Sequence, residues 1–383
     1  MRIGLDARPA LLSRSGISRY VAELVAALAR RSGEHSLRLY GDSWRPILEG
    51  ERSTLVREAA RAGSKHRLHR LPIPGRLARL LGPVGYGAES RLGRLDIFHH
   101  TDLVFLPVRR APSVVTVYDL SFELEESFHG AEFRRDVSPR LRAAVAGAQA
   151  ILTPSEATRR DLERLYDTGD TPIHVTPLAA DHLFRTPRAS DEEVERLLQA
   201  RAITGEYILC VGTLEPRKNH ERLLNAFEVF ARDHEHTLVL IGGAGWLCEH
   251  LEARLSEFEK SGRVVRLRGL DDSFLPGLYE RASMSIYPSL YEGFGLPVLE
   301  AMTCRTATIT TQRGSLPEVG GDAVLYCDPE DEASIQQAMA RVAEDEQLRH
   351  DLEQRGAERA RLFSWDRVAE ETLAVYRSCL EGS

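Results

Sequence analysis

Cysteine and long apolar stretches are scarce in this chain of 383 residues. The five cysteines are widely separated and none shows the spacing of a zinc ligand set, so we expect neither a zinc site nor a disulfide framework. No apolar run approaches the roughly 20 residues that span a bilayer, and the first residues lack the apolar core of a signal peptide. We therefore expect a cytoplasmic protein with its cysteines buried as small apolar side chains.

Lysine is also rare, since it occurs only at Lys65, Lys218 and Lys260 among 50 basic residues. The net charge of −7 is unevenly distributed along the chain. Residues 1–182 carry 27 basic against 22 acidic side chains, or +5, whereas residues 183–383 carry 23 against 35, or −12. The two halves are therefore expected to meet different electrostatic partners.

Short apolar runs alternate with helix-like segments, which is the pattern of parallel βαβ units. In the first half the expected strands are residues 3–7, 95–98, 114–118, 150–154 and 174–177. In the second half they are residues 207–211, 238–241, 264–267, 284–287 and 307–310. Helices are expected at residues 18–29, 220–233 and 365–380, and Ser155 is the expected N-cap of another that continues to Leu165.

Two doubly wound α/β domains in tandem account for this pattern. A polar, acidic segment at residues 178–202 separates the halves. We therefore place one Rossmann-like domain at residues 1–182 and a second at residues 183–362. A last helix, at 363–383, is expected to return toward the N-terminal domain. Because ligands of such sheets bind at the carboxyl ends of the strands, residues just after strands are the candidates for a site.

The most informative segment, residues 289–302, follows the fourth expected strand of the second half. It holds Glu292 and Glu300 on either side of a glycine-rich turn, and Pro297 fits the first turn of a helix. The N–H groups at that helix start suit a diphosphate. Glu300 then lies about one turn into the helix, where a carboxylate can accept two hydrogen bonds from the diol of a ribose. The structural alternative is an ordinary strand–turn–helix corner with two solvated glutamates.

Two cations, Arg217 and Lys218, follow the first expected strand of the second half. Cations at the start of a helix are disfavoured by the helix dipole, so an anionic partner explains them better than a solvated surface does. A diphosphate that departs as a leaving group gains negative charge. Cations placed beside it stabilise the transition state more than the ground state.

The spacing of Glu292 and Glu300 resembles the EX7E motif of the retaining GT-B glycosyltransferases, family 4. Other segments resemble further family features: the first loop of the C-terminal domain, a Pro-Glu turn, the N-terminal glycine loop and the "HDLSF" segment. In this chain they are residues 211–219, 315–319, 16–20 and 116–122. The likeness covers nearly the whole chain and is densest at residues 205–330. It implies an α/β GT-B fold, a nucleotide-sugar donor in the C-terminal domain, no required metal or other cofactor, and retention at the anomeric carbon.

The donor side follows from the residues together with this resemblance. Glu300 is expected to hold the ribose, Arg217 and Lys218 the diphosphate, and Glu292 with the turn after it the sugar. The predicted donor-binding residues are Gly212, Thr213, Arg217, Lys218, Arg268, Leu270, Glu292, Gly293, Phe294, Gly295, Leu296 and Glu300. By resemblance Arg268 and Leu270 flank the nucleobase, with a plain loop as the alternative. Thr213 stands where the family often has an arginine, whose role Arg217 is the candidate to take.

The acceptor side is predicted at Gly16, Tyr118 and Asp119. The family commonly has a histidine where Tyr118 stands. A tyrosine can donate a hydrogen bond to a sugar hydroxyl but cannot shuttle protons near pH 7. Asp119 either orients the acceptor hydroxyl or caps the next segment, and Gly16 either admits a ligand close to the backbone or forms a tight turn. The predicted catalytic residues are Glu292, Arg217, Lys218, Tyr118 and Asp119.

Two other features carry weaker predictions. Residues 61–94 hold eight cations and one acid, interleaved with apolar residues. They form either a contact with an anionic membrane surface or anionic acceptor, or a solvated arginine-rich surface. Nucleic acid is not expected, because the segment lacks an aromatic stacking platform. The pair His99-His100 has no third ligand at a suitable spacing, so no metal is expected there.

These observations predict a retaining glycosyltransferase of polysaccharide biosynthesis. It would move a hexose from a nucleotide diphosphate to a hydroxyl of a saccharide, a glycolipid or a small metabolite. The opening "GLDAR…GISRY" resembles family members that look like GDP-mannose-dependent mannosyltransferases, which favours mannose, and UDP- and dTDP-sugars stay open. Retention without an evident nucleophile predicts a same-face mechanism. The alternatives are a GT-B-fold nucleotide-sugar epimerase and a non-catalytic sugar-nucleotide binding protein.

Overall fold

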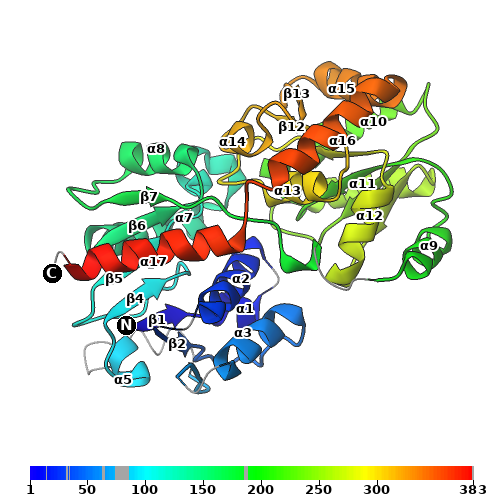
Figure 1. Ribbon diagram of the computed structural model, residues 1–383. Helices are drawn as coiled ribbons and strands as arrows, with labels where there is room; N and C mark the ends of the chain where they lie inside the picture. The colour runs from blue at the N-terminus through cyan, green and yellow to red at the C-terminus, as the bar shows by residue number, and fades with distance from the viewer. Residues whose placement is uncertain are drawn as a thin grey trace. The chain divides into compact units, whose positions relative to one another are not determined.

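The computed structural model describes residues 1–13, 15–31, 33, 35–62, 65–73, 86–184 and 189–381. The chain divides into two compact units (Figure 1). Unit 1 comprises residues 1–120, 134–178 and 364–383, and unit 2 comprises residues 121–133 and 179–363. The short segment 121–133 therefore belongs with the second unit, although it lies in the first half of the sequence.

Unit 1 is built on a seven-stranded parallel sheet of order β3-β2-β1-β4-β5-β6-β7. Its strands are β1 (Arg2–Asp6), β2 (Ser36–Tyr40), β3 (Arg67–His69), β4 (Ile97–His100), β5 (Ser113–Thr116), β6 (Ala150–Thr153) and β7 (Ile173–Val175). The chain order reverses between β1 and β4, which are hydrogen-bonded neighbours. Ligands of open α/β sheets bind at such a switch point, outside the carboxyl ends of the strands.

Helices flank this sheet because their apolar faces need a partner. They are α1 (Arg8–Leu12), α2 (Gly16–Arg30), α3 (Glu51–Arg61), α5 (Ala88–Leu92), α8 (Glu156–Leu165) and α17 (Trp365–Glu381), and α7 (Ala131–Ala146) begins in unit 2 and continues here. Ser155 caps α8 as predicted, since its side chain accepts a hydrogen bond from the backbone N–H of Thr158. The last helix, α17, belongs with unit 1 and is drawn in red along it in Figure 1.

Buried hydrogen bonds fasten α17 to the sheet. The hydroxyl of Tyr376 lies 2.6 Å from Nδ1 of His99, and Nε2 of His99 lies 2.7 Å from the hydroxyl of Thr116. Burial lowers the pKa of His99 to about 3, so this imidazole is neutral at physiological pH. The first histidine of the pair is therefore a buried structural residue of β4.

Unit 2 is built on a six-stranded parallel sheet of order β10-β9-β8-β11-β12-β13. Its strands are β8 (Tyr207–Val211), β9 (Thr237–Ile241), β10 (Val264–Leu267), β11 (Met284–Tyr287), β12 (Thr308–Thr311) and β13 (Leu325–Cys327). Its switch point lies between β8 and β11. Those two strands lead into the two loops that carry the sequence motifs.

The helices of unit 2 cover this sheet. They are α6 (Ser121–Leu124), α9 (Asp191–Ala200), α10 (His220–Phe230), α11 (Glu249–Lys260), α12 (Leu275–Arg281), α13 (Leu296–Thr303), α14 (Leu316–Gly320), α15 (Glu332–Glu344) and α16 (Glu346–Ala360), with 3-10 turns η1 (Glu126–Phe128), η2 (His182–Phe184), η3 (Pro216–Lys218) and η4 (Asp272–Phe274). The segment expected to be a polar separator instead contains α9, whose Val194 and Leu198 join the core of this unit.

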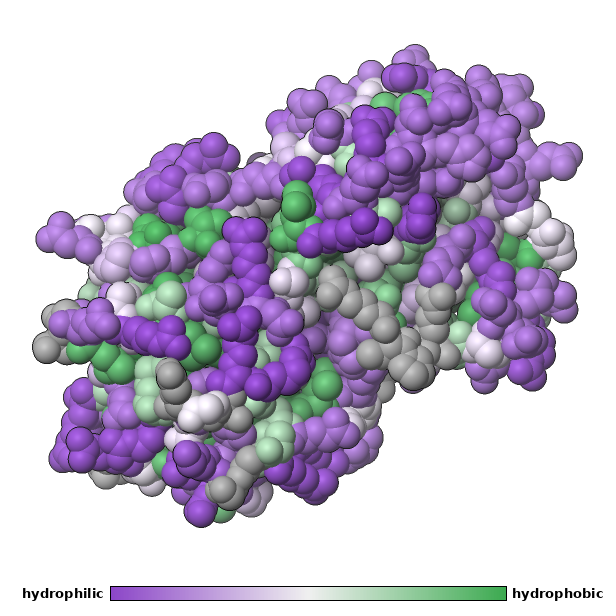
Figure 2. Space-filling model, in the orientation of Figure 1, coloured by the Kyte–Doolittle hydropathy of each residue, from purple (hydrophilic) through white to green (hydrophobic). Residues whose placement is uncertain are grey.

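The surface agrees with a composition in which 28% of residues are charged. The face seen in Figure 2 is mostly hydrophilic, with apolar residues in separate patches. Among the residues that the structure describes, no helix combines the length and the apolar character needed to cross a bilayer.

Candidate active site

The loop after β8 places the two predicted cations. Its η3 turn carries Arg217 and Lys218, and it ends at Asn219, which has a left-handed backbone with φ of 61°. The side-chain amide of Asn219 donates hydrogen bonds of 3.1 Å and 2.7 Å to the carbonyls of Pro288 and Pro329. These bonds hold the loop against the loops that follow β11 and β13, so the cations lie at the carboxyl edge of the sheet.

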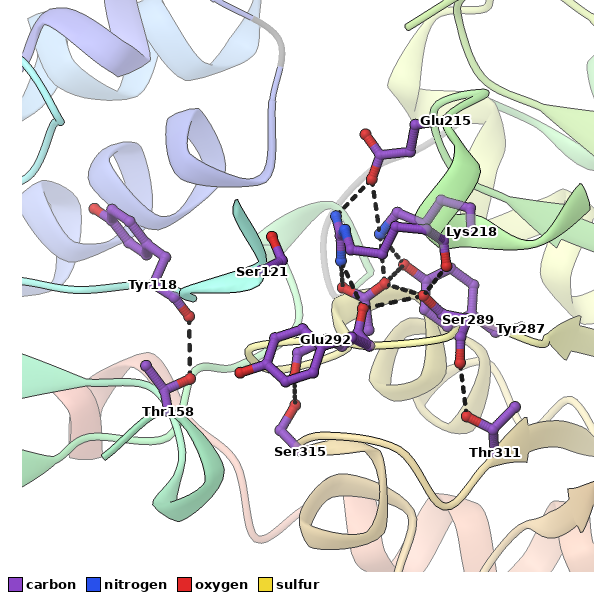
Figure 3. A network of polar contacts seen from close by, with 12 residues as sticks. Tyr118, Ser121, Thr158, Glu215, Lys218, Tyr287, Ser289, Glu292, Thr311 and Ser315 are labelled. Atoms are coloured by element: carbon purple, nitrogen blue, oxygen red, sulfur yellow. Dashed lines mark hydrogen bonds and ion pairs between the residues drawn. The ribbon is translucent and has the colours of Figure 1, made fainter. Parts of the chain in front are cut away.

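Glu292 lies at the centre of this edge, and Figure 3 shows the side chains that converge on it. Its Oε1 accepts hydrogen bonds from Nζ of Lys218 at 2.6 Å, from Ser289 at 2.6 Å and from the hydroxyl of Tyr287 at 2.9 Å. Its Oε2 lies 2.8 Å from a guanidinium nitrogen of Arg217. Glu292 is only 6% exposed, so the carboxylate depends on these partners in place of water.

Arg217 also pairs with Glu215 at 2.6 Å, so these ion pairs among the described residues join two cations to two carboxylates. Burial alone would raise the pKa of Glu292, but the positive charges of Arg217 and Lys218 outweigh it and lower that pKa to about 2. Burial and the neighbouring Arg217 lower the pKa of Lys218. Glu292 is therefore ionised at neutral pH.

The turn between Glu292 and α13 needs glycine at one position in particular. Gly295 has φ of 101°, and a Cβ there would lie 2.6 Å from a methyl carbon of Leu316. Pro297 lies in the first turn of α13, as predicted. The N-terminus of α13, the positive end of its helix dipole, therefore lies on the same loop as Glu292, at the sheet edge.

Glu300 lies farther along α13 and apart from the ion cluster. It is only 1% exposed, and the hydroxyl of Tyr279 on α12 donates a long hydrogen bond of 3.4 Å to its Oε2. The two glutamates of the motif therefore have different surroundings, one among cations and the other beside a tyrosine. This difference fits the separate roles predicted for them, sugar binding by Glu292 and ribose binding by Glu300.

The Pro-Glu turn at residues 315–319 contacts the motif through the backbone. Both the N–H and the hydroxyl of Ser315 donate to the carbonyl of Glu292, each at 3.0 Å. Gly314 has φ of 57°, and a Cβ there would lie 2.4 Å from the same carbonyl oxygen. The turn therefore fixes the backbone that positions Glu292.

The other donor-side candidates are unevenly placed. Gly212 and Thr213 begin the loop that carries Arg217, and Phe294 is buried with its ring centroid 5.9 Å from that of Phe363. Arg268, by contrast, follows β10, the outermost strand of the sheet, and its exposed side chain pairs with Glu252 at 3.0 Å.

Leu270 lies on the same loop and packs against the core of α9 and α12. A Cβ at Gly212 would lie 3.6 Å from the ring of Tyr287 and 3.9 Å from Lys218, so Gly212 adjoins the ion cluster. Contact of Arg268 and Leu270 with the nucleobase stays a prediction.

Unit 1 holds the acceptor-side candidates. Gly16 is the first residue of α2, and Tyr118 and Asp119 follow β5. The hydroxyl of Tyr118 donates a 2.8 Å hydrogen bond to the carbonyl of Thr101, and burial raises its pKa well above the ordinary value. In this structure the hydroxyl proton of Tyr118 is therefore directed at Thr101, and its donation to a sugar hydroxyl stays a prediction. The role of Asp119 stays a prediction.

A second buried ion group lies at the switch point of unit 1, and the sequence analysis did not predict it. Arg8 pairs with Asp6 through two guanidinium nitrogens, and a guanidinium nitrogen lies 4.0 Å from Asp102. Burial lowers the pKa of His100 to about 4 and raises that of Asp102. The sequence feature that could have predicted this group is "LDAR" at the end of β1, where an acid and a cation follow an apolar strand.

The basic segment 61–94 lies partly outside the described residues, which leave out 63–64 and 74–85 and with them Arg76 and Arg79. Arg91 pairs with the buried Asp42 at 2.6 Å, and Arg70 donates to the carbonyl of Arg45. These two cations are engaged within unit 1. Membrane contact by the segment stays a prediction.

Comparison with known proteins identifies the family. Residues 14–182 match the family described as "Glycosyltransferase Family 4", and residues 191–359 match "Glycosyl transferases group 1". The chain is 31% identical to the O-antigen chain mannosyltransferase B of Escherichia coli, over 98% of this chain and all of the relative. The chain belongs to glycosyltransferase family 4. The resemblance inferred from the sequence motifs is thereby confirmed, and this family 4 protein is a glycosyltransferase.

Other relatives and solved structures support the same placement. This family 4 chain is 26% identical to the D-inositol 3-phosphate glycosyltransferase of Corynebacterium jeikeium, over 96% of this chain and 93% of the relative. Sucrose-phosphate synthase from Thermosynechococcus elongatus has a similar fold, with a TM-score of 0.78 at 21% identity and full coverage of both chains. Anabaena HepE in complex with UDP and glucose gives a TM-score of 0.71 at 16% identity, covering 98% and 99%. The predicted GT-B fold of two Rossmann-like domains is confirmed.

Proposed function

We propose that this protein is a retaining mannosyltransferase that transfers mannose from GDP-mannose to a hydroxyl of a saccharide acceptor. The observation that carries the proposal is the buried cluster of Arg217, Lys218 and Glu292 at the carboxyl edge of unit 2. The choice of mannose is supported by the relative named a mannosyltransferase, which matches the chain over its full length. An epimerase or a binding protein has less support, since the named relatives are transferases.

The cluster suits a diphosphate leaving group. Arg217 and Lys218 are 10% and 12% exposed, so their charges act in a weakly screened environment. Glu215 and Glu292 hold the two cations in place before the donor binds, which lowers the cost of organising them during the reaction. The N–H groups at the start of α13 add a second source of positive potential. These groups supply the stabilisation for which other enzymes use a metal ion, and we propose that none is required.

The ion pairs and hydrogen bonds of Glu292 bear on how the transfer retains the configuration of the anomeric carbon. A carboxylate held by Lys218, Arg217 and two hydroxyls is a weak nucleophile, because its lone pairs are already engaged. We therefore assign Glu292 to sugar binding and to holding the cations. Retention then follows a same-face path in which a phosphate oxygen of the departing GDP takes the proton of the acceptor hydroxyl. Trapping a covalent glycosyl-enzyme would rule this path out.

The donor assignment is tested by thermal unfolding with GDP-mannose, UDP-glucose, ADP-glucose and dTDP-glucose. A ligand at 100 times its Kd adds about 2.7 kcal/mol of stability, so the true donor raises Tm measurably. We expect GDP-mannose to give the largest rise, Lys218→Met to abolish it and Lys260→Met, on the surface of α11, to leave it intact. A Lys218→Met variant with wild-type donor binding and turnover would show that the site is wrong. A larger rise with another nucleotide sugar would keep the site and overturn GDP-mannose.

A further inference from the structure

Aromatic rings from two distant parts of the sequence stack on the surface of unit 2. The ring of His129 lies 5.2 Å from that of Phe133 at an interplanar angle of 18°, and 5.1 Å from that of Trp246 at 25°. Phe133 and Trp246 are 41% and 40% exposed, whereas Phe122, which packs edge-on against Phe133, is buried. The group of Phe133, His129 and Trp246, called here the aromatic platform, therefore presents large ring surfaces to solvent.

Hydrogen bonds fix the aromatic platform before any ligand arrives. The indole N–H of Trp246 donates to the carbonyl of Phe128 at 2.6 Å, and Nε2 of His129 lies 2.9 Å from the hydroxyl of Ser121. With the indole N–H already engaged, Trp246 offers ring surface and no polar group. A side chain held in this way loses little conformational entropy when it binds.

The aromatic platform lies at the same edge of the sheet as the predicted donor-binding residues. The loop of Trp246 follows β9, so it leaves the same carboxyl edge of the sheet as the loop of Lys218. The two loops are hydrogen-bonded, since Leu214 N–H donates to Gly243 and Gly245 N–H donates to Leu214, each at 3.0 Å. The turn η1 beside His129 contacts η3, which carries Lys218.

The residue after Trp246 has an unusual conformation. Leu247 has φ of 53°, in the left-handed region that leucine rarely adopts, and its side chain is 54% exposed. Packing in the core explains neither the strain nor the exposure. Strained backbone of this kind is concentrated at ligand-binding positions.

The charge of the neighbouring segment narrows the class of ligand. Residues 121–135 contain four acids and two arginines, Arg134 and Arg135, which leaves a net charge of −2. Proteins that stack single-stranded nucleic acids on aromatic rings do so in positively charged grooves, and anionic membranes attract basic segments. An acidic surround therefore favours a neutral ligand with an apolar face, as the C–H face of a pyranose ring is.

We propose that Trp246, His129 and Phe133 bind a pyranose ring of the acceptor saccharide, at least one residue away from the sugar that receives the transferred unit. The inference rests on the proposed function in one respect, namely that the acceptor is a saccharide. It assigns these three residues to acceptor binding and leaves the chemistry to the ion cluster.

Direct binding provides a test that needs no turnover. The chain has three tryptophans, of which Trp44 is 65% exposed and Trp365 is buried, so Trp44→Phe leaves Trp246 as the main exposed fluorophore. Titrating this variant with α-mannotriose in the absence of donor is expected to change its fluorescence saturably. In the same background, Phe133→Ala is expected to weaken binding about tenfold, by the scale of one aromatic contact. No saturable change would overturn the proposal.

Transfer kinetics provide the second test. We expect Trp246→Ala to raise the KM for α-mannotriose about tenfold, to leave the KM for the donor unchanged and to leave transfer to methyl α-mannoside unaffected. Trp246→Phe, which keeps a ring, is expected to restore most of the loss, and Trp44→Ala to behave as wild type. Equal KM values for the trisaccharide in wild type and Trp246→Ala would overturn the proposal. Binding of mannotriose by an enzyme that transfers no mannose would instead overturn the proposed function and leave the aromatic platform standing.

Discussion

Replacing Glu292 by glutamine should destabilise unit 2 strongly, because the variant removes a carboxylate that pairs with both Arg217 and Lys218 in a buried site. The substitution preserves size and removes the charge. Breaking a buried pair by removing one partner costs about 3–5 kcal/mol. The lowering of the pKa of Glu292 to about 2 gives a similar figure of about 3 kcal/mol, because each unit of pKa corresponds to about 1.36 kcal/mol. We therefore expect the free energy of unfolding to fall by about 3 kcal/mol at pH 7.

The effect should also depend on pH in a defined direction. The pKa of Glu292 is lower in the folded protein than its value of about 4.3 in an unfolded chain, so its stabilisation is complete above that pH and is lost as the pH falls toward 2. Between pH 6 and pH 3.3 the wild type should lose about 1 kcal/mol of this contribution, whereas the glutamine variant has no such contribution to lose. The difference between the two proteins should shrink by that amount.

Urea unfolding followed by far-ultraviolet circular dichroism at several pH values measures both quantities. Glu330→Gln is the matched control, because Glu330 is 63% exposed, pairs with Arg313 on the surface and should contribute at most about 1 kcal/mol. A Glu292→Gln variant within about 1 kcal/mol of wild type at pH 7, or a difference that is the same at pH 6 and pH 3.3, would refute the reasoning.

Three further predictions concern individual contacts. Tyr376→Phe should lower the free energy of unfolding by about 1–3 kcal/mol, because it leaves a ring nitrogen of His99 buried without this hydrogen-bond partner. Urea unfolding measures the change, and an unchanged midpoint would show that this hydrogen bond does not stabilise the packing of α17. Glu300→Gln should raise the KM for the donor about tenfold. It should also make GDP and 2′-deoxy-GDP equally strong inhibitors, and a preference for GDP equal to that of the wild type would show that Glu300 does not hold the ribose. Gly295→Ala should lower Tm by several degrees and reduce activity, because the new Cβ meets Leu316 at a left-handed backbone position; a fully stable and active variant would contradict the geometry of this turn.

The donor side was largely predictable because its signals are local. The strands β8 to β12 appear within about one residue of their expected bounds, since each is an apolar run followed by a turn. Arg217, Lys218 and Glu292 lie in the loops that follow two neighbouring parallel strands, β8 and β11, so the parallel topology predicts that they lie at the same edge of the sheet. Their partners Tyr287 and Ser289 were not predicted, because a tyrosine at a strand end has many ordinary explanations.

The features that the sequence analysis missed depend on long-range geometry. Sheet order, which makes β10 the outermost strand of its sheet, cannot be read from a sequence of alternating elements, and contact of Arg268 with the nucleobase stays a prediction. The hydroxyl of Tyr118 binds a carbonyl 17 residues away, and the aromatic platform joins His129 to Trp246 across more than a hundred residues. By contrast, α9 could have been recognised from the capping box of Ser190 and Glu193, a local pattern in a segment that composition alone marked as a linker.

The most direct measurement is proton NMR of the product formed from GDP-α-D-mannose and α-mannotriose by the purified enzyme in the presence of EDTA. The proposed function predicts one new α-linked mannosyl residue for each GDP released, with the rate lost in Lys218→Met. A β-linked product would contradict retention. Dependence of the rate on added metal would contradict the role given to Arg217 and Lys218. Release of free or isomerised mannose without a new linkage would contradict glycosyl transfer to a saccharide.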